Sequence, residues 1–212
     1  MSIRNNYPKR MASEMFYIRN HLIGARLAGA ENDPAPLGTY VLSRDRVFLE
    51  ADRIEFRAKV PVSMISPPLS ALPVDLPKFQ WKIPKPPAAI LYREILPFFM
   101  MINDLSENNQ MEALVNVVWR DSSWRVVFPT QTVSDSYVSS KQPLPDGTVL
   151  QIHSHGGHKP FWSLTDDSDE IGFLVYGVVG KLSSDQVEML FRVGIGGHWL
   201  LIGGDDVFSG FE

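Results

Sequence analysis

The chain contains no cysteine among its 212 residues. This absence excludes disulfide bonds, thiolate nucleophiles, iron–sulfur clusters and cysteine zinc sites. Any metal ion must therefore be bound by histidine, aspartate or glutamate. A protein that needs no disulfide bonds is compatible with the cytoplasm, and the cytoplasm is where we expect this one.

Long apolar runs and basic runs are lacking as well. The longest strongly apolar run, residues 95–102 (ILPFFMMI), is far shorter than the roughly 20 residues that span a bilayer. The N-terminal MSIRNNYPKR has no apolar signal core. The net charge of −4 argues against a broad phosphate-binding surface. We therefore predict a soluble protein that binds neither membrane nor nucleic acid.

The remaining composition is that of a globular protein, with 44% hydrophobic and 21% charged residues, and it allows a sizeable core. Half of the 16 prolines fall in residues 61–87, where they exclude a continuous helix or a central strand. We interpret this segment as an extended surface connector. It predicts a boundary between an N-terminal extension, residues 1–87, and a second domain, residues 88–212.

The extension combines two patterns. Residues 10–30 have the apolar spacing of an amphipathic helix. In residues 39–63, short apolar runs alternate with Arg-Asp and Ala-Asp turns, which predicts two or three strands of a meander.

The second domain begins with a helix and continues with strands. Pro86-Pro87 fit the first turn of a helix over residues 88–106, in which Pro97 introduces a kink. The strand patterns after it are a hairpin over 111–131, a strand over 144–155, a strand over 171–182 and a hairpin over 187–204. This order predicts an α+β fold with a helix packed on a mixed sheet.

Histidine is scarce, with five in the chain, yet three of the five fall at positions 153, 155 and 158. His153 and His155 end an expected strand, in which residues i and i+2 point to the same face. The two imidazoles therefore face a common point, as two ligands of one metal ion must. A third ligand can come from Asp166 or Asp167, because the intervening loop is long enough to fold back. Two imidazoles and one carboxylate are a reasonable zinc set that leaves one position for water.

The spacing around these residues matches a known pattern. It consists of His153-Ser154-His155, seven residues, Ser163, two residues and Asp166. This pattern resembles that of the JAMM (MPN+) metalloproteases, which are zinc isopeptidases without a thiol or serine nucleophile. The resemblance implies a JAMM/MPN-like mixed sheet packed with helices.

The same family needs a glutamate on the strand after its first helix. Glu112 stands at the start of the strand expected after the 88–106 helix. The alternatives are Glu94, which lies inside that helix, and Glu107, which lies at its end, so neither begins a strand. The resemblance covers roughly residues 88–204.

The resemblance assigns a role to each matching residue. It implies that His153, His155 and Asp166 bind Zn²⁺. It implies that Glu112 holds and deprotonates the attacking water and that Ser163 stabilises the tetrahedral oxyanion.

The sequence around the motif narrows the match. It reads IHSHG and FWSLTDDSDE, followed by GFLVYGVVGKL and FRVGIGGHWLLI. They resemble the prokaryotic branch called PRTRC system protein A, whose members carry an N-terminal extension. Members of that branch are encoded beside a ThiF/E1-like protein and a small ubiquitin-like protein. The resemblance implies a hydrolase that cuts a peptide or isopeptide bond at the C-terminal tail of a ubiquitin-like protein. The chain lacks the long insertion with which eukaryotic members grip ubiquitin, so we do not expect ubiquitin itself as the substrate.

Several residues near the motif also have simpler interpretations. Ser163 begins an S-L-T-D run that is typical of a helix cap. Asp167 and Asp169 fit first-turn charges that favour the helix dipole. His158 fits a loop residue near the site better than a fourth ligand, because catalytic zinc keeps that position open.

Two other functions stay open at this point. The first is a non-catalytic interaction scaffold with an MPN-type fold, although such relatives lack the ligand set that this chain keeps. The second is a metal-dependent hydrolase of small peptides or amino-acid conjugates, which bulky Phe161 and Trp162 would favour if they close the cleft.

Overall fold

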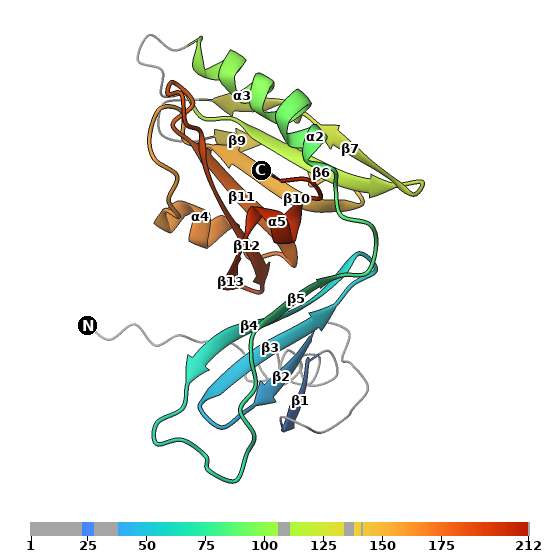
Figure 1. The fold of residues 1–212 in the computed structure, drawn as a ribbon, viewed down its shortest axis with the longest axis vertical. Helices are drawn as coiled ribbons and strands as arrows, with labels where there is room; N and C mark the ends of the chain where they lie inside the picture. Colours follow the sequence, from blue (N-terminus) through green and yellow to red (C-terminus); the bar gives the residue numbers. More distant parts are fainter. Residues whose placement is uncertain (1–22, 28–37, 106–110, 134–137, 141, 212) are drawn as a thin grey trace, which may run out of the picture.

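The computed structural model describes residues 23–27, 38–105, 111–133, 138–140 and 142–211. Within these residues the fold is α+β, as predicted, and consists of two sheets with few helices (Figure 1). No helix in the described part of the chain is long and apolar enough to cross a membrane.

The first sheet has five strands in sequential order. They are β1 (Ile23–Leu27), β2 (Gly38–Leu42), β3 (Arg46–Asp52), β4 (Phe56–Met64) and β5 (Lys78–Trp81). Strands β2, β3 and β4 form the predicted antiparallel meander. The helix predicted over residues 10–30 is wrong for its described part, because Ile23–Leu27 is a strand that pairs in parallel with β2. Backbone pairing with β2 overrides the helical spacing there; the rest of that prediction lies outside the described residues.

The proline-rich segment is mostly irregular, as predicted, but it also contains a strand. Residues Lys78–Trp81 contain no proline and pair with β4 as an edge strand. Their aromatic rings pack on Phe56, with centroid distances of 5.4 Å from Phe79 and 5.7 Å from Trp81. The prediction of a plain connector is therefore wrong for these residues, and it is also wrong for residues 61–64, which form the end of β4 and pair with β3.

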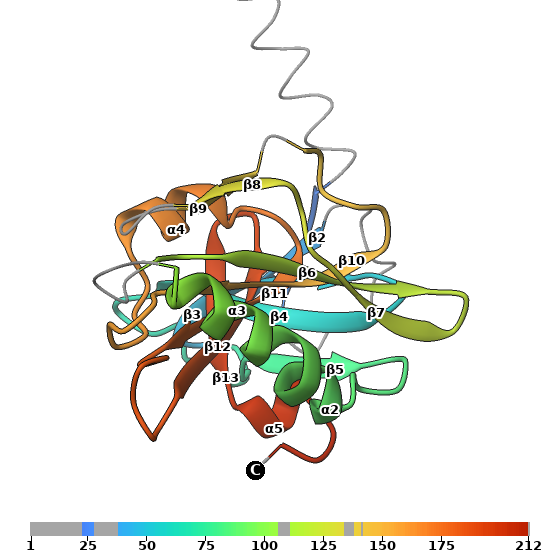
Figure 2. The same ribbon diagram turned by 90° about the horizontal axis from the view of Figure 1, so that it is seen from above.

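One helical run precedes the second sheet. It comprises α2 (Ala88–Ile90), the π-helical turn η1 (Leu91–Ile95) and α3 (Leu96–Asn103). The π turn ends two residues before Pro97, whose missing N–H interrupts the regular hydrogen-bond ladder. The run lies across one face of the second sheet (Figure 2), and its buried side chains belong to the same core as those of the strands.

The second sheet has six strands in the order β13-β12-β11-β10-β6-β7. Its strands are β6 (Leu114–Arg120), β7 (Ser123–Val127), β10 (Thr148–Ser154), β11 (Leu174–Gly180), β12 (Glu188–Ile195) and β13 (His198–Ile202). Strands β10 and β11 pair in parallel and the other neighbours pair antiparallel, so the predicted mixed sheet and both predicted hairpins are confirmed. Asp121 and Ser122 both have positive φ, 51° and 57°, in the tight turn between β6 and β7.

Four short elements complete the fold. They are β8 (Gln131–Val133), β9 (Val138–Ser140), α4 (Leu164–Asp169) and α5 (Gly204–Val207). Strands β8 and β9 form a separate two-stranded sheet. The helix α4 begins at the predicted residue, whereas β8, β9 and α5 were not predicted.

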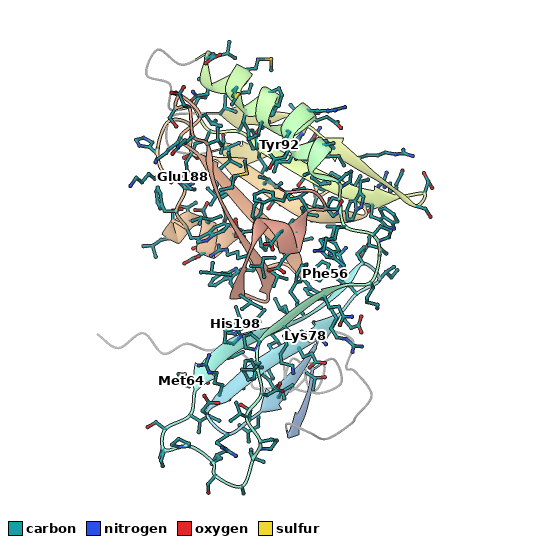
Figure 3. All side chains as sticks on the ribbon, viewed as in Figure 1. Phe56, Met64, Lys78, Tyr92, Glu188 and His198 are labelled. Atoms are coloured by element: carbon teal, nitrogen blue, oxygen red, sulfur yellow. The ribbon has the colours of Figure 1, made fainter. Side chains whose placement is uncertain are left out.

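The two sheets share one core. Strand β4 packs against β12 and β13, and buried residues of both sheets belong to one hydrophobic cluster. Phe56 lies where the first sheet meets the second (Figure 3), and its ring centroid is 4.8 Å from that of Phe173. The first sheet lies within residues 1–87 and the second within 88–212, and their division into two domains stays a prediction.

Arg53 connects the two sheets by hydrogen bonds. Its guanidinium donates to the carbonyl oxygens of Phe173 (2.8 Å) and Thr148 (3.0 Å) and pairs with the carboxylate of Glu55 (2.6 Å). We expect Arg53→Ala to lower the free energy of unfolding by about 3 kcal/mol, because it leaves two carbonyls and a buried carboxylate without a partner. Urea denaturation measures this loss.

Arg57→Ala is the matched control for that variant. Arg57 pairs with Asp52 on the same sheet, but half of its side chain is exposed, so its loss should cost less than about 1 kcal/mol. Equal losses for the two variants would show that the contacts between the sheets contribute nothing special to stability.

Candidate metal centre

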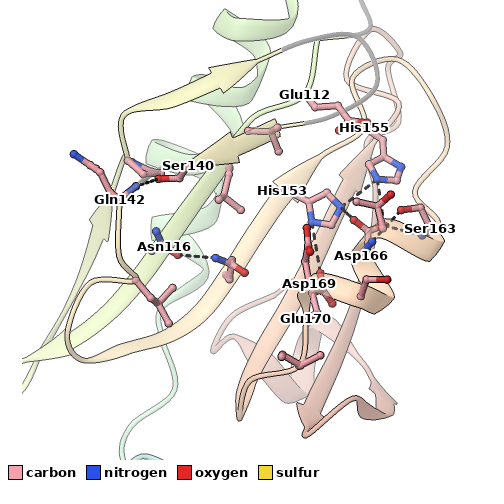
Figure 4. Close-up of a pocket in the computed structure, with 18 of the residues that line it drawn as sticks. Glu112, Asn116, Ser140, Gln142, His153, His155, Ser163, Asp166, Asp169 and Glu170 are labelled. Carbon is pink, nitrogen blue, oxygen red and sulfur yellow. Dashed lines mark hydrogen bonds and ion pairs between the residues drawn. The ribbon is translucent and has the colours of Figure 1, made fainter. Parts of the chain in front are cut away.

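Strand β10 positions the two histidines. It lies in the middle of the second sheet, between β6 and β11. His153 belongs to the strand and His155 follows it directly, where its N–H donates to the carbonyl oxygen of Val179 and continues the extended backbone. Ser154 points to the opposite face and its hydroxyl accepts a hydrogen bond from the N–H of Ala113 at 3.0 Å. The two imidazoles therefore share one face, as predicted (Figure 4).

Helix α4 brings the carboxylate. Its N-cap Ser163 and Asp166 form a reciprocal capping box: the Asp166 N–H donates to the Ser163 hydroxyl (3.1 Å), and the Ser163 N–H donates to the Asp166 carboxylate (2.7 Å). The predicted cap is thus confirmed. It also fixes the side chain of Asp166 with its carboxylate toward both histidines.

The distances between these three side chains suit one ion. The Nε2 atoms of His153 and His155 are 3.1 Å apart, and the Asp166 carboxylate oxygens lie 3.3 Å from the first and 3.9 Å from the second. Donor atoms bound at about 2.0–2.1 Å to a tetrahedral ion are about 3.3 Å apart. Within the described residues the three side chains form a group that could hold a metal ion, with all donor atoms within 4.8 Å.

The electrostatics of the site favour neutral imidazoles. Burial lowers the pKa of His153 to about 4, against the attraction of the Asp166 carboxylate. Burial also lowers the pKa of His155. Both rings are therefore neutral near pH 7, which is the form that binds a metal ion through a nitrogen lone pair.

Glu112 lines the cleft beside the histidines (Figure 4). It lies two residues before β6, and Ala113 next to it exchanges hydrogen bonds with Ser154 of β10. Burial, together with the Asp166 carboxylate, raises the pKa of Glu112 to about 7. Of the two alternative glutamates, Glu94 is exposed on the π turn and Glu107 lies outside the described residues.

The bulky residues before α4 occupy different places. Phe161 lines the cleft, with its ring 4.6 Å from that of His155. Trp162 instead packs over the guanidinium of Arg192 and presents its edge to His153. Phe161 thus narrows the cleft, as the sequence suggested. Trp162 does not line the cleft and packs on Arg192 instead.

The remaining candidates lie outside the ligand group. Asp167 pairs with Arg192 at 2.6 Å, and Asp169 lines the cleft without belonging to the group. His158 is exposed in the loop after His155. Asp167 lies in the first turn of α4, as predicted, whereas Asp169 is the last residue of that helix, so the first-turn interpretation is wrong for Asp169.

The cleft extends well beyond His153, His155 and Asp166 and has a volume of about 570 Å³. Its floor includes Asn116 and Gln151, whose side-chain amides are hydrogen bonded at 3.3 Å. Ser140 and Gln142 face them from the β8–β9 side (Figure 4). This part of the cleft carries neutral polar groups, in contrast to the carboxylates around the histidines.

Sequence reasoning missed two buried charged residues behind the site, Glu170 and Arg192. Glu170 stood among several carboxylates in the DDSDE run and gave no separate signal. Arg192 is the one charged residue in the predicted apolar strand LFRVGIGG, and a buried charge needs a partner. That irregularity was the only available signal.

Comparison with known proteins finds no matching family model and no matching curated protein.

Proposed function

We propose that the protein is a zinc-dependent hydrolase of the JAMM/MPN+ type, with Zn²⁺ bound by His153, His155 and Asp166. The observation that carries the proposal is the convergence of these donor atoms at tetrahedral spacing, at one end of an accessible cleft. The donor set of two nitrogens and one oxygen suits zinc. Ser163 stands at the offset of the JAMM pattern, Glu112 precedes the strand that follows the first helix, and both line the cleft.

The residues around the ligands divide the chemistry between them. A bound zinc ion would polarise the scissile carbonyl and make water a stronger nucleophile. Glu112 takes the proton of the attacking water and passes it to the leaving amine. The Ser163 hydroxyl already accepts a hydrogen bond from the Asp166 N–H, and its own proton has no acceptor among the described residues. That proton is therefore available to donate to the oxyanion.

The shape and lining of the cleft support a peptide substrate. The amides of Asn116 and Gln151 offer neutral donors and acceptors, which a peptide backbone requires. Val138 and Ser140 place β9 along the cleft, where an extended tail could pair as an added strand. The proposed substrate is the C-terminal tail of a ubiquitin-like protein, joined to a peptide or to a lysine side chain. A ThiF/E1-like protein is the proposed further partner.

A cleavage assay tests this function. Zinc-loaded protein is incubated with ubiquitin-like proteins that carry a C-terminal peptide extension, and the masses of the products are measured. We expect the protein to remove the extension. A chelator should abolish this cleavage, and added zinc should restore it. Bound zinc without cleavage of any such protein would favour a non-catalytic scaffold.

A second candidate function is the hydrolysis of small peptides or amino-acid conjugates. It is favoured by Phe161, whose ring lies against His155 and narrows the cleft at the ligands. Short peptides in the same assay separate the two candidates. If the protein cleaves only the short peptides, the second candidate function is favoured.

Ser163 has two roles in this account, and substitution separates them. Ser163→Ala removes the cap and the donor, so we expect a loss of about 1 kcal/mol in stability and of about 10²–10³ in kcat. Ser163→Thr keeps a hydroxyl that serves both roles and should retain most of the activity. If Ser163→Ala loses stability but keeps its kcat at a temperature where it is fully folded, Ser163 is only a helix cap.

A further inference from the structure

A buried ion pair lies directly behind the proposed metal ligands. Arg192 comes from β12 and Glu170 is the C-cap of α4, and their side chains are only 3% and 5% exposed. Both Nε and Nη2 of Arg192 contact the same carboxylate oxygen, Oε2, at 2.7 and 2.6 Å. The other oxygen, Oε1, faces Nδ1 of His153 at 3.8 Å (Figure 4).

The surroundings hold this pair in one arrangement. The guanidinium of Arg192 lies between the rings of Trp162 and Trp199, 3.9 and 4.4 Å from their centroids. Its Nη1 also donates to Asp167 at 2.6 Å. The indole N–H of Trp199 donates to the backbone carbonyl of Glu170 at 3.1 Å. Glu170 is therefore fixed at both its backbone and its carboxylate.

Stability alone is a weak explanation for such a pair. Removing two charges from water is costly, and well-packed apolar residues in their place are often neutral or stabilising. The geometry indicates another role, because the pair leaves one carboxylate oxygen toward a proposed metal ligand.

Whether His153 can bind an ion through Nε2 depends on which of its ring nitrogens carries the proton. Its Nε2 faces His155 and Asp166, so binding an ion there requires the proton to be on Nδ1. An acceptor near Nδ1 favours that tautomer and holds the ring in place. The 3.8 Å separation from Glu170 is longer than a hydrogen bond, so the interaction in this structure is electrostatic. Among the described residues, no carboxylate lies within ion-pair distance of Nδ1 of His155.

We propose that Glu170, held by Arg192, is a positioning residue that keeps His153 in the tautomer and orientation in which Nε2 binds the metal ion. This inference rests on the proposed metal site. Glu170 thereby raises the affinity of the site for the metal ion without contacting the ion itself.

Metal affinity tests the proposal without any substrate. The dissociation constant for Zn²⁺ is measured by competition with a chromophoric chelator for the wild type, Glu170→Ala, Glu170→Gln and Asp167→Ala. We expect Glu170→Ala to bind zinc about 10–100-fold more weakly. Glu170→Gln keeps the shape but replaces the charged carboxylate by a neutral amide, so it should bind zinc more weakly than the wild type and more tightly than Glu170→Ala. Asp167→Ala also removes a partner of Arg192 but lies away from His153, so its affinity should stay close to that of the wild type.

A second readout separates positioning from a general effect on the fold. Nitrogen NMR shifts of the zinc-free protein report the tautomer of each histidine. We expect His153 to carry its proton on Nδ1 in the wild type and to become a mixture of tautomers in Glu170→Ala, with His155 unchanged. A variant that merely loosened the fold would change both rings.

The outcomes are distinguishable. Unchanged zinc affinity in Glu170→Ala overturns the positioning role while the proposed metal site stands. If Glu170→Ala does not fold, Glu170→Gln decides, and unchanged affinity in that variant overturns the role. A wild type that binds no zinc overturns the proposed function and this inference with it.

Discussion

Glu112→Gln is expected to keep its zinc and to lose turnover by about 10²–10⁴-fold, the usual contribution of a positioned general base. Glu112 lines the cleft with the histidines but does not belong to the group of three donor residues. The amide has nearly the same shape as the carboxyl group and cannot take a proton from water. Substitution also removes the repulsion between Glu112 and the Asp166 carboxylate, so the fold should not be weakened.

The measurement pairs zinc content with the rate of tail cleavage. Glu94→Gln is the matched control, because it makes the same chemical change at an exposed position on the π turn. It should keep both zinc and turnover. A Glu112→Gln variant that cleaves at the wild-type rate would remove Glu112 from the mechanism.

Loss of a proposed ligand should abolish zinc binding. His153→Ala leaves one imidazole and one carboxylate, and Asp166→Asn weakens the third ligand while keeping an oxygen for the capping box with Ser163. After dialysis, elemental analysis should find about one zinc ion per wild-type chain and close to none in either variant. Zinc at 100 times its dissociation constant should stabilise the wild type by about 2.7 kcal/mol and the variants hardly at all.

His158→Ala is the control for these variants. His158 belongs to the same histidine-rich stretch but is exposed in the loop after His155. It should bind zinc like the wild type. If His158→Ala loses zinc while His153→Ala retains it, the ligand set proposed here is wrong.

The local features of the site could be predicted because each depends on a short stretch of sequence. The shared face of His153 and His155 follows from strand alternation over three residues. The start of α4 follows from the cap formed by Ser163 and Asp166. The hairpin turn at Asp121 and Ser122 likewise follows from local turn chemistry.

The supporting features could not be predicted, because they depend on residues far apart in the chain. Glu170 and Arg192 are 22 residues apart, and Arg53 and Phe173 are 120 apart. Such contacts depend on which strands pair and in which register, and a local sequence pattern contains no information about either. The strand at Ile23–Leu27 was missed for the same reason, since its pairing with β2 and not its own spacing decides its conformation.

The most direct test of the account is a crystal structure of the zinc-loaded protein with diffraction data collected at the zinc absorption edge. We predict one anomalous peak between Nε2 of His153, Nε2 of His155 and the Asp166 carboxylate, at about 2.0–2.2 Å from each donor atom. The three donor groups diverging with no peak between them, or a peak bound by other residues, would contradict the central claim.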